Sequence, residues 1–227
     1  IIGLGPIGAT LANLLGRYNI KTLVLERQSA AFGLPRAVMF DDEVMRVFQS
    51  MKLSEAMSNI AEVGGGAKFV DAEGNVLVNW HRPRELSPNG WFVNYRFHQP
   101  ELEKELHDNL KNFRTVEILW NAEVVALNQD EKSVSISYLD KSSGEQRVIN
   151  AGYAVGCDGS RSFVREYISA DIIDLGFHEP WLVIDIIMKQ PDHQIEPESI
   201  HFCEHERAST YVYLGSKRKR WEFRLTN

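Results

Sequence analysis

The sequence predicts a mixed α/β fold built from two interleaved substructures. One is a Rossmann-like β-α-β unit, indicated by a glycine motif at residues 3–8 that lies between strand residues and a helix-like segment. The other is an antiparallel sheet, indicated by alternating apolar and polar residues over 133–138 and by strand-like segments after residue 171. This mixture is not typical of one continuous doubly wound sheet.

The β-α-β unit is predicted within the first 26 residues. Residues 1–2 predict the end of a strand, and residues 22–26 predict the next short strand. Between them, residues 6–18 predict a helix, because apolar residues recur at helical spacing and Pro6 suits a first helical turn. The apolar positions of this helix are Ile7, Leu11, Leu14, Leu15 and Tyr18.

The later elements alternate between helices and short strands. Residues 41–50 predict a helix capped by Asp41 or Asp42. A hairpin is predicted over 67–80, with its turn at 73–75, and a helix is predicted from Gln99 with an apolar stripe. The stripe consists of Leu102, Leu106 and Leu110, and further strands are expected within 116–155 and at 181–188, 210–214 and 221–225.

Composition and charge narrow the class of protein. The chain has 227 residues, of which 44% are hydrophobic, and its formal net charge is -6, so no basic surface favours nucleic acid. Two cysteines, Cys157 and Cys203, cannot make a disulfide framework, so we expect a reducing compartment. No apolar run reaches the roughly 18–20 residues of a membrane span, and no leader precedes the first motif. We therefore expect a cytoplasmic protein without a membrane or nucleic-acid partner.

Neither end of the sequence completes an element of the predicted fold. The chain opens on the glycine motif, with only Ile1 and Ile2 left of a strand that normally has about five residues. It closes on the strand-like segment 220–225 without a further element. We expect the fold to be incomplete at both ends.

The glycine motif predicts a dinucleotide site. In Gly3-Leu4-Gly5-Pro6-Ile7-Gly8, the first glycine permits a tight turn, the second lets backbone approach a pyrophosphate, and the third allows close helix–strand packing. The phosphates then lie at the positive end of the helix dipole. Glu26, at the end of the next strand, can accept hydrogen bonds from ribose hydroxyls and disfavours a 2′-phosphate there. The motif does not distinguish FAD from NAD.

Four stretches together resemble the flavoprotein aromatic hydroxylases of the para-hydroxybenzoate and phenol hydroxylase group, and within it the 3-(3-hydroxyphenyl)propionate hydroxylase branch. The resemblance implies the para-hydroxybenzoate hydroxylase type of FAD-binding domain, at 1–64 and 98–170. It also implies an interleaved substrate-binding sheet domain at 65–97 and 171–227. The four stretches are Gly3–Gly8, Pro35-Arg36-Ala37-Val38, Phe97-His98-Gln99-Pro100-Glu101-Leu102 and Gly156-Cys157-Asp158-Gly159-Ser160-Arg161-Ser162.

The resemblance also implies roles for single residues. Arg36 corresponds to an arginine near the flavin, on the side where a nicotinamide cofactor approaches, and a solvated loop arginine is its plainer interpretation. Gln99 corresponds to a glutamine on the flavin's linking chain, and Val124 to a backbone contact with adenine. Asp158 and Gly159 correspond to a motif shared by FAD and nicotinamide cofactors, although Asp158 could instead cap the following helix. The predicted cofactor-binding residues are Gly3, Gly5, Pro6, Ile7, Gly8, Glu26, Arg27, Arg36, Gln99, Val124, Asp158 and Gly159.

The implied activity is that of an FAD-dependent monooxygenase. NADH or NADPH would reduce FAD, and a flavin hydroperoxide would hydroxylate a phenolic aromatic acid or a related phenol. The flavin performs this chemistry, so no catalytic residue is assigned beyond Arg36 as a candidate. A small aromatic substrate and molecular oxygen are the expected partners, with a homodimer left open.

Two alternatives remain for the function. One is another flavoenzyme of the same fold, such as an epoxidase, halogenase or reductase. The other is a non-catalytic fragment, because the resemblance implies a later Gly-Asp flavin motif that nothing after Asp171 matches. Product analysis and a flavin absorbance spectrum distinguish these alternatives.

Three further patterns are interpreted as structural. His201, Cys203 and His205 would share one face of a strand, but neighbours about 7 Å apart do not converge on zinc, so no metal site is predicted. The run 217–220 is interpreted as a solvated hairpin tip. Strand aromatics could line a substrate pocket beside the predicted sheet, yet we expect at least half to be core. These aromatics are Trp181, Tyr211, Tyr213 and Trp221.

Overall fold

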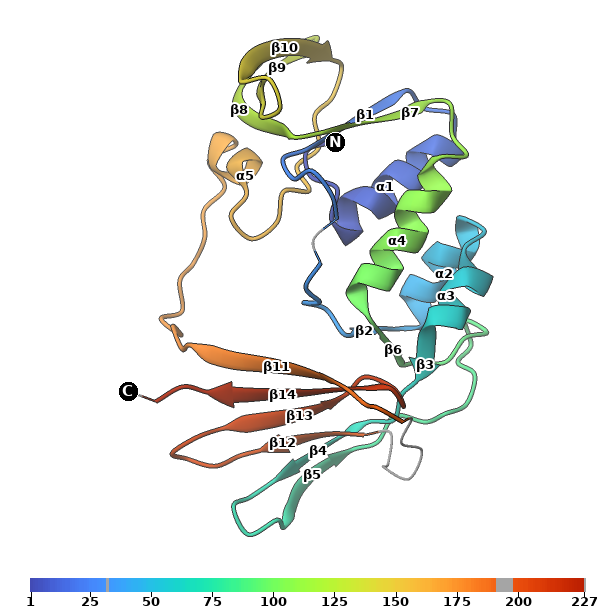
Figure 1. Ribbon diagram of the computed structural model, residues 1–227, viewed down its shortest axis with the longest axis vertical. Helices are drawn as coiled ribbons and strands as arrows, with labels where there is room; N and C mark the ends of the chain where they lie inside the picture. Colours follow the sequence, from blue (N-terminus) through green and yellow to red (C-terminus); the bar gives the residue numbers. More distant parts are fainter. Residues whose placement is uncertain (32, 191–197, 227) are drawn as a thin grey trace. The chain divides into compact units, whose positions relative to one another are not determined.

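The computed structural model describes residues 1–31, 33–190 and 198–226, and the chain divides into two compact units (Figure 1). Unit 1 comprises Ile1–Pro35 and Pro100–Ile173, and unit 2 comprises Arg36–Gln99 and Asp174–Asn227. The units are thus interleaved along the sequence, as predicted. Residues 36–64 pack with unit 2. The division into an FAD-binding domain at 1–64 and 98–170 and a substrate-binding domain at 65–97 and 171–227 stays a prediction.

Unit 1 contains the predicted β-α-β unit. Helix α1 (Pro6–Arg17) leads to strand β1 (Thr22–Glu26), which pairs in parallel with β7 (Val116–Trp120). Ile2 bridges in parallel both to Leu25 of β1 and to Gly156, so residues 1–2 are the end of a strand, as predicted. These parallel pairings bring the loop after Ile2 to the carboxyl end of β1.

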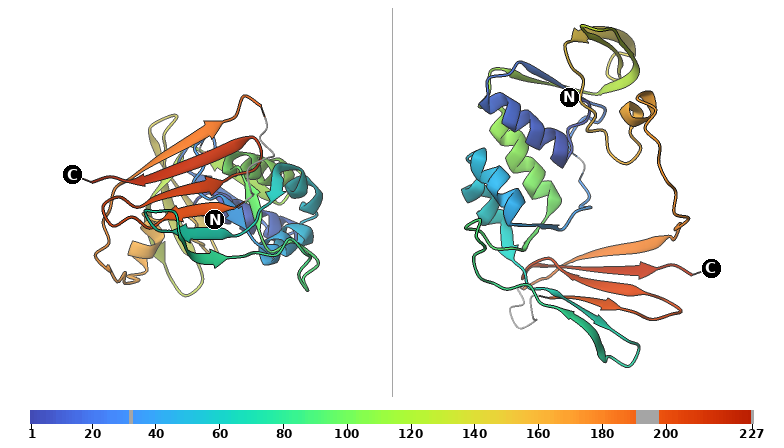
Figure 2. Two further views of the ribbon diagram at one scale, coloured as in Figure 1. Left: turned by 90° about the horizontal axis from the view of Figure 1, so that it is seen from below. Right: turned by 180° about the vertical axis from the view of Figure 1, so that it is seen from behind.

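The buried face of α1 is made of small residues and not of the large apolar residues that reveal the helix in the sequence. Ile7 and Tyr18 are 73% and 76% exposed, and Gly16 lies so close to helix α4 (Gln99–Leu110) and its following turn that an added Cβ would be 2.6 Å from the Phe113 ring. The two helices lie side by side (Figure 2, right). The buried positions are Gly8, Ala9, Ala12, Asn13 and Gly16.

Asn13 links these two helices. Its side chain is fully buried, and its Nδ2 donates hydrogen bonds to the carbonyls of Ala9 at 2.8 Å and Leu106 at 3.0 Å. The predicted stripe of α4 is confirmed, since Leu102, Leu106 and Leu110 are buried. The Asn13 side chain thus joins the middle of α1 to α4.

An antiparallel sheet completes unit 1. Strands β8 (Ala122–Gln129), β9 (Val134–Asp140) and β10 (Glu145–Ala151) form it in the order β10-β9-β8, and the short helix α5 (Phe163–Tyr167) follows. The predicted alternation is confirmed, because Ile136 and Tyr138 are buried. They pack with Leu25 and Ala122 in one apolar cluster that joins this sheet to β1.

Unit 2 begins with two helices and a three-stranded sheet. Strand β2 (Met39–Phe40) precedes α2 (Asp42–Ser50), and α3 (Ser54–Ile60) runs into β3 (Ala61–Val63). Asp41 caps α2 as predicted, since its Oδ1 accepts a hydrogen bond from the Val44 N–H at 3.0 Å. Strand β6 (Tyr95–Phe97) lies between β2 and β3.

The second sheet of unit 2 has six strands in the order β11-β14-β13-β12-β4-β5 (Figures 1 and 2). The predicted hairpin forms β4 and β5, and β4 pairs in parallel with β12. The sheet that starts in the hairpin therefore continues after residue 171, as expected. Its strands are β4 (Ala67–Val70), β5 (Val76–Trp80), β11 (Trp181–Ile187), β12 (Ser199–Phe202), β13 (Ser209–Tyr213) and β14 (Arg218–Arg224).

The interpretation of residues 217–220 as a solvated tip is wrong for Lys219 and Arg220, although Lys217 is exposed. Lys219 and Arg220 are only 4% and 3% exposed, because β14 already begins at Arg218. The Lys219 ammonium lies over the Tyr213 ring and donates to the Gly215 carbonyl at 3.1 Å. The Arg220 guanidinium pairs with both carboxylate oxygens of Asp185, at 2.8 and 3.0 Å. These partners offset the desolvation cost of burying the two charged side chains.

Of the four singled-out strand aromatics, at least two are core. Tyr211 and Tyr213 are buried, whereas Trp181 is 41% exposed. Trp221 stacks within its own sheet, with ring centroids 5.0 Å from Tyr211 and 6.2 Å from Phe223. A pocket lined by these aromatics stays a prediction.

Among the helices of the described residues, none has the length and apolar character of a membrane span.

Candidate functional site

Two glycines of the motif are required by the chain's own backbone, and the third leaves open space. Gly3 has φ +97°, and a Cβ there would lie 2.4 Å from the Cys157 carbonyl oxygen. A Cβ on Gly8 would lie 2.0 Å from the carbonyl oxygen of Gly3. A Cβ on Gly5 meets nothing within 4 Å. The turn is closed on itself but open at Gly5, where the motif predicts a pyrophosphate.

The start of α1 presents free backbone donors beside this opening. The helix begins at Pro6, and its first backbone hydrogen bond runs from the Ala9 N–H to the Gly5 carbonyl at 2.9 Å. The N–H groups of Ile7 and Gly8 precede that bond, so they have no acceptor within the helix. No acidic side chain occupies the first turn. The helix end can therefore bind an anion.

Glu26 lies at the same loop. Its Oε2 accepts a hydrogen bond from the Leu4 N–H at 2.8 Å, and its Oε1 accepts from the Gln28 N–H at 2.9 Å. Each carboxylate oxygen has capacity for a second hydrogen bond, which a ribose hydroxyl can supply. Arg27, the next residue, is exposed. The predicted acceptor and the predicted phosphate site thus lie at one loop.

A residue that the sequence did not single out also contacts this loop. The Nε2 of His107, on α4, lies 3.1 Å from the Leu4 carbonyl oxygen. Its ring packs edge-on against Trp120, which is the register partner of Glu26. His107 follows Leu106 of the apolar stripe, and no spacing rule distinguishes it from a solvated helix residue. Only the close packing of α1 and α4 reveals it.

The Asp158-Gly159 motif also lies beside the glycine loop. The Cys157 N–H donates to the Ile2 carbonyl at 2.7 Å, and the Asp158 Cα is 3.0 Å from an ideal Cβ at Gly3. Gly159 has φ +83°, with nothing within 4 Å of an added Cβ, so its backbone is open to a ligand. Unit 1 therefore gathers Gly3, Gly5, Gly8, Glu26, Asp158 and Gly159 at one place.

Asp158 itself performs the capping role that was its alternative interpretation. Its Oδ1 accepts from the Ser162 hydroxyl at 2.5 Å, and its Oδ2 accepts from the Val164 N–H at 3.1 Å. Ser162 in turn caps α5 through the Arg165 N–H at 3.0 Å. Both oxygens of Asp158 are therefore hydrogen-bonded within the chain, although each can accept once more. A ribityl contact by Asp158 stays a prediction.

Gln99 and Arg36 lie in unit 2 and contact each other. The buried Oε1 of Gln99 accepts hydrogen bonds from the backbone N–H groups of Arg36 at 2.9 Å and Ala37 at 2.8 Å. The Arg36 carbonyl accepts from Arg220 at 3.2 Å, and its side chain is exposed. Gln99 thus fixes the course of the 35–38 segment. The flavin contacts of both residues stay predictions.

Val124 belongs to the sheet of unit 1. It pairs with Tyr138 and packs against the apolar cluster around Leu25. The register shifts between Val124 and Ala126, so the intervening Val125 forms a bulge and is 43% exposed. Bulges redirect backbone groups at the end of a strand pairing. An adenine contact through the Val124 backbone stays a prediction.

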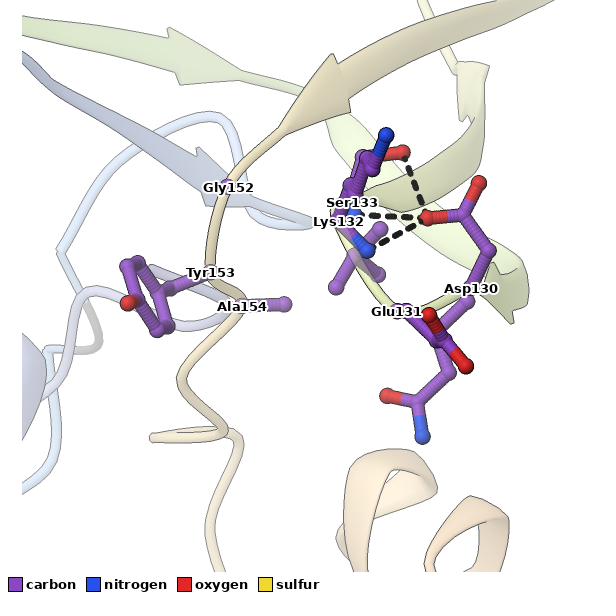
Figure 3. A pocket seen from close by; sticks show the side chains of 9 residues that line it. Asp130, Glu131, Lys132, Ser133, Gly152, Tyr153 and Ala154 are labelled. Carbon is purple, nitrogen blue, oxygen red and sulfur yellow. Dashed lines mark hydrogen bonds between the residues drawn. The ribbon is translucent and has the colours of Figure 1, made fainter.

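A small hollow on unit 1 involves none of the predicted site residues. It is lined by residues 129–134 and 152–154 (Figure 3). The Oδ1 of Asp130 accepts from the N–H groups of Lys132 and Ser133 at 2.7 and 2.8 Å, and these bonds lower the pKa of that carboxyl. The polar groups there satisfy one another, as in an ordinary turn.

His201, Cys203 and His205 do not lie on one continuous strand. Strand β12 ends at Phe202, so Cys203 and His205 lie outside it. His201 stacks on Phe69 with ring centroids 4.5 Å apart, and burial lowers its pKa. In the part of the chain that the structure describes, no group of three or more His, Cys, Asp or Glu side chains is placed to hold a metal ion.

Comparison with known proteins identifies the family of this chain. Over residues 1–226 the chain matches the family described as the FAD binding domain. The chain belongs to that family. It is 33% identical over 227 residues to the probable NADH-specific resorcinol 4-hydroxylase of Rhodococcus jostii (strain RHA1). It is also 33% identical over 223 residues to the 3-(3-hydroxy-phenyl)propionate/3-hydroxycinnamic acid hydroxylase of Burkholderia cenocepacia (strain HI2424).

The chain corresponds to part of those relatives. The first alignment covers 99% of the chain and 42% of the relative, and the second covers 98% and 40%. The p-nitrophenol 4-monooxygenase PnpA from Pseudomonas putida DLL-E4 has the same fold, with a TM-score of 0.84 at 19% identity over 99% of this chain and 56% of that one. The flavin-dependent monooxygenase PieE, solved with FAD and substrate, gives 0.82 at 18% identity over 100% of the chain and 42% of that structure. The predicted mixed α/β fold, shared with solved flavin-dependent monooxygenases, is confirmed.

Proposed function

We propose that the protein binds FAD and acts in the NADH- or NADPH-dependent hydroxylation of a phenolic ring. One observation carries the proposal: the glycine loop is closed by Cys157 on one side, carries the Glu26 carboxylate on another, and is open at Gly5. This arrangement provides a positive helix end for a pyrophosphate and an acceptor for a ribose. Membership of the FAD-binding family, with aromatic hydroxylases among the relatives, supports FAD over NAD as the dinucleotide.

The residues at the loop have separable roles in this proposal. The N–H groups of Ile7 and Gly8 would bind phosphate oxygens, and Glu26 would accept from the adenosine ribose. Gly159 would allow the linking chain of the cofactor to pass close to the backbone. These residues fix the adenosine half, and the family resemblance assigns Arg36 and Gln99 to the flavin half. Bound FAD would accept a hydride from the nicotinamide cofactor and supply the oxidising chemistry for ring hydroxylation.

The proposed substrates are a phenolic aromatic acid or a related simple phenol. The names of the two relatives specify resorcinol and 3-(3-hydroxyphenyl)propionate, which both carry a phenolic hydroxyl and a second polar substituent in the meta position. We propose molecular oxygen as the second substrate and the cytoplasm as the compartment. Cys157 and Cys203 are both free thiols, which suits a reducing environment.

Gly5 offers a direct test of cofactor binding. A side chain there meets no protein atom within 4 Å, so Gly5→Val should fold normally but occupy the space proposed for the pyrophosphate. We expect the Kd for FAD, measured by flavin fluorescence quenching, to rise on the order of 100-fold, or about 2.7 kcal/mol. Gly152→Val is the matched control, since that glycine is also unobstructed and lies outside the loop.

Catalysis is tested separately from binding. FAD-loaded protein should consume NADH or NADPH in step with the appearance of a catechol from a meta-substituted phenol. An epoxide, a halogenated product or a reduced product would instead indicate another flavoenzyme of this fold.

The binding test has its own contradicting outcome. Equal FAD affinity of the Gly5→Val and Gly152→Val variants would contradict the proposed site.

A further inference from the structure

Unit 2 contains a buried arginine whose charge is not balanced. Arg96 lies in β6, the middle strand of the three-stranded sheet, opposite Met39 of β2 and Glu62 of β3. Only 8% of the residue is exposed. A guanidinium stays charged when it is buried, so it requires acceptors and a counter-charge.

The described residues do not supply those partners. None of them forms an ion pair with Arg96 or accepts a hydrogen bond from its guanidinium, and the buried Nε is without a partner. Glu62, directly across the strand pair, uses its carboxylate on the Ser216 N–H at 2.9 Å and the Tyr213 hydroxyl at 3.1 Å. The carboxylate that lies opposite Arg96 in the strand pairing is therefore already hydrogen-bonded to other groups.

The surroundings of Arg96 add positive charge instead of removing it. Arg82 interacts unfavourably with Arg96, and burial followed by this repulsion lowers the pKa of the Arg96 guanidinium. Arg82 itself lies over the Trp80 ring, 4.5 Å from its centroid. Burial lowers the pKa of the nearby His201; the Glu222 carboxylate opposes this shift, and the charge of Arg96 adds to it. The local potential favours an anion.

Gly64 leaves room for the buried Arg96 side chain. A Cβ on Gly64 would lie 2.9 Å from the Arg96 Cγ and 3.1 Å from its Nε, so only glycine leaves room for this side chain. Asn94 is 2% exposed; its Nδ2 donates to the Gly65 carbonyl, while its Oδ1 has no partner. Two buried polar side chains with unused capacity therefore lie within the short segment 94–96.

We propose that Arg96 binds the carboxylate of an aromatic acid substrate. A guanidinium and a carboxylate match each other as planar, two-pronged partners, and this pairing is strongest where water is excluded. The aromatic pair Phe69 and His201, at 4.5 Å, offers apolar surface near the charged group. The assignment rests on the proposed function, which supplies the aromatic substrate. It specifies a phenolic acid over a neutral phenol.

The test compares a phenolic acid with its neutral amide. 3-(3-Hydroxyphenyl)propionate and 3-(3-hydroxyphenyl)propionamide are titrated into the protein, with and without FAD, and tryptophan fluorescence reports binding. We expect the acid to bind about 10- to 100-fold more tightly than the amide, the range expected for a desolvated charge-assisted contact. Acetate should compete with the acid, because it carries the same group, and acetamide should not compete at equal concentration.

Variants assign the effect to Arg96. Arg96→Met should abolish the preference for the acid while leaving amide binding unchanged, and Arg96→Lys should retain part of the preference. Arg46→Met, at an exposed arginine of α2 in the same unit, is the matched control and should behave as the wild type. Thermal unfolding without ligand verifies that each variant folds. Only proteins that keep a positive charge at this position, as the wild type and Arg96→Lys do, should gain thermal stability from the acid.

The failures of this assignment and of the proposed function differ. Equal affinity for acid and amide in the wild type overturns the carboxylate site even if a neutral phenol is hydroxylated. Absence of FAD binding overturns the proposed function. The fluorescence titration without FAD still decides whether Arg96 binds the acid. If Arg96→Met does not fold, the acid–amide comparison in the wild type and Arg96→Lys provides the decision.

Discussion

The glycine loop of unit 1 and the β13–β14 turn of unit 2 use the same local device. In each, a glycine with positive φ is followed by an N–H that donates to a glutamate distant in sequence: Gly3 precedes the Leu4–Glu26 bond, and Gly215 precedes the Ser216–Glu62 bond. The φ values are +97° and +99°. The two sites nevertheless differ in what surrounds the carboxylate.

At the β13–β14 turn the carboxylate is surrounded by protein donors. Glu62 accepts from the Ser216 N–H, the Ser216 hydroxyl at 3.1 Å and the Tyr213 hydroxyl, and its Oε1 lies 2.6 Å from an ideal Cβ on Gly215. Glu26 accepts one N–H on each oxygen, and the nearby Gly5 faces open space. One device closes a turn, whereas the other leaves acceptor capacity and volume for a ligand.

The largest effect should come from adding a methyl group to the closed side of the glycine loop. In Gly3→Ala, the new Cβ would be 2.4 Å from the Cys157 carbonyl in a backbone conformation that alanine disfavours. We expect the free energy of unfolding to fall by about 4 kcal/mol, measured by urea denaturation. Gly215→Ala should cost about 2 kcal/mol, because its obstacle is a Glu62 side chain that can move. Equal losses would show that the two turns are equally rigid.

Removing the carboxylates should separate the two sites further. Glu62→Ala deprives the buried Tyr213 hydroxyl and the Ser216 N–H of their acceptor, so we expect a loss of about 2–3 kcal/mol in unfolding free energy. Glu26→Ala should cost only about 1 kcal/mol, since of its two donors the Gln28 N–H is exposed and can turn to water, which leaves the Leu4 N–H alone without its acceptor. Its larger effect should be on FAD affinity. A greater loss of stability in Glu26→Ala than in Glu62→Ala would contradict the distinction between a carboxylate that closes a turn and one that binds a ligand.

The smallest effect concerns pH. Burial, assisted by the Glu62 carboxylate, raises the pKa of Tyr213 from 10.0 to about 12. The neutral phenol is favoured in the folded state, so its contribution is fully present below pH 10 and is lost as the pH rises towards 12. We expect up to about 2 kcal/mol to disappear over that window, measured by chemical denaturation. In Tyr213→Phe the corresponding part of the pH dependence should be absent. An unchanged slope in that variant would refute the assignment to Tyr213.

Local patterns in the sequence determined the elements and the loop. The 3.6-residue spacing predicted α1 and α4, the alternation over 133–138 predicted β9, and the motif at residues 3–8 predicted an open glycine beside a helix end. These features depend on neighbouring residues, so the chain order alone specifies them. The capping of α2 by Asp41 was predictable for the same reason.

Tertiary structure alone decided which groups are buried and which partners they have. The small face of α1 is buried because α4 approaches it closely, and Arg220 is buried because Asp185 lies on a strand that pairs with β14. The unbalanced charge of Arg96 is likewise invisible in the sequence, where Glu62 could have been its partner. Pairings across long stretches of chain set burial and charge compensation, and no periodicity in the sequence records which pairings occur.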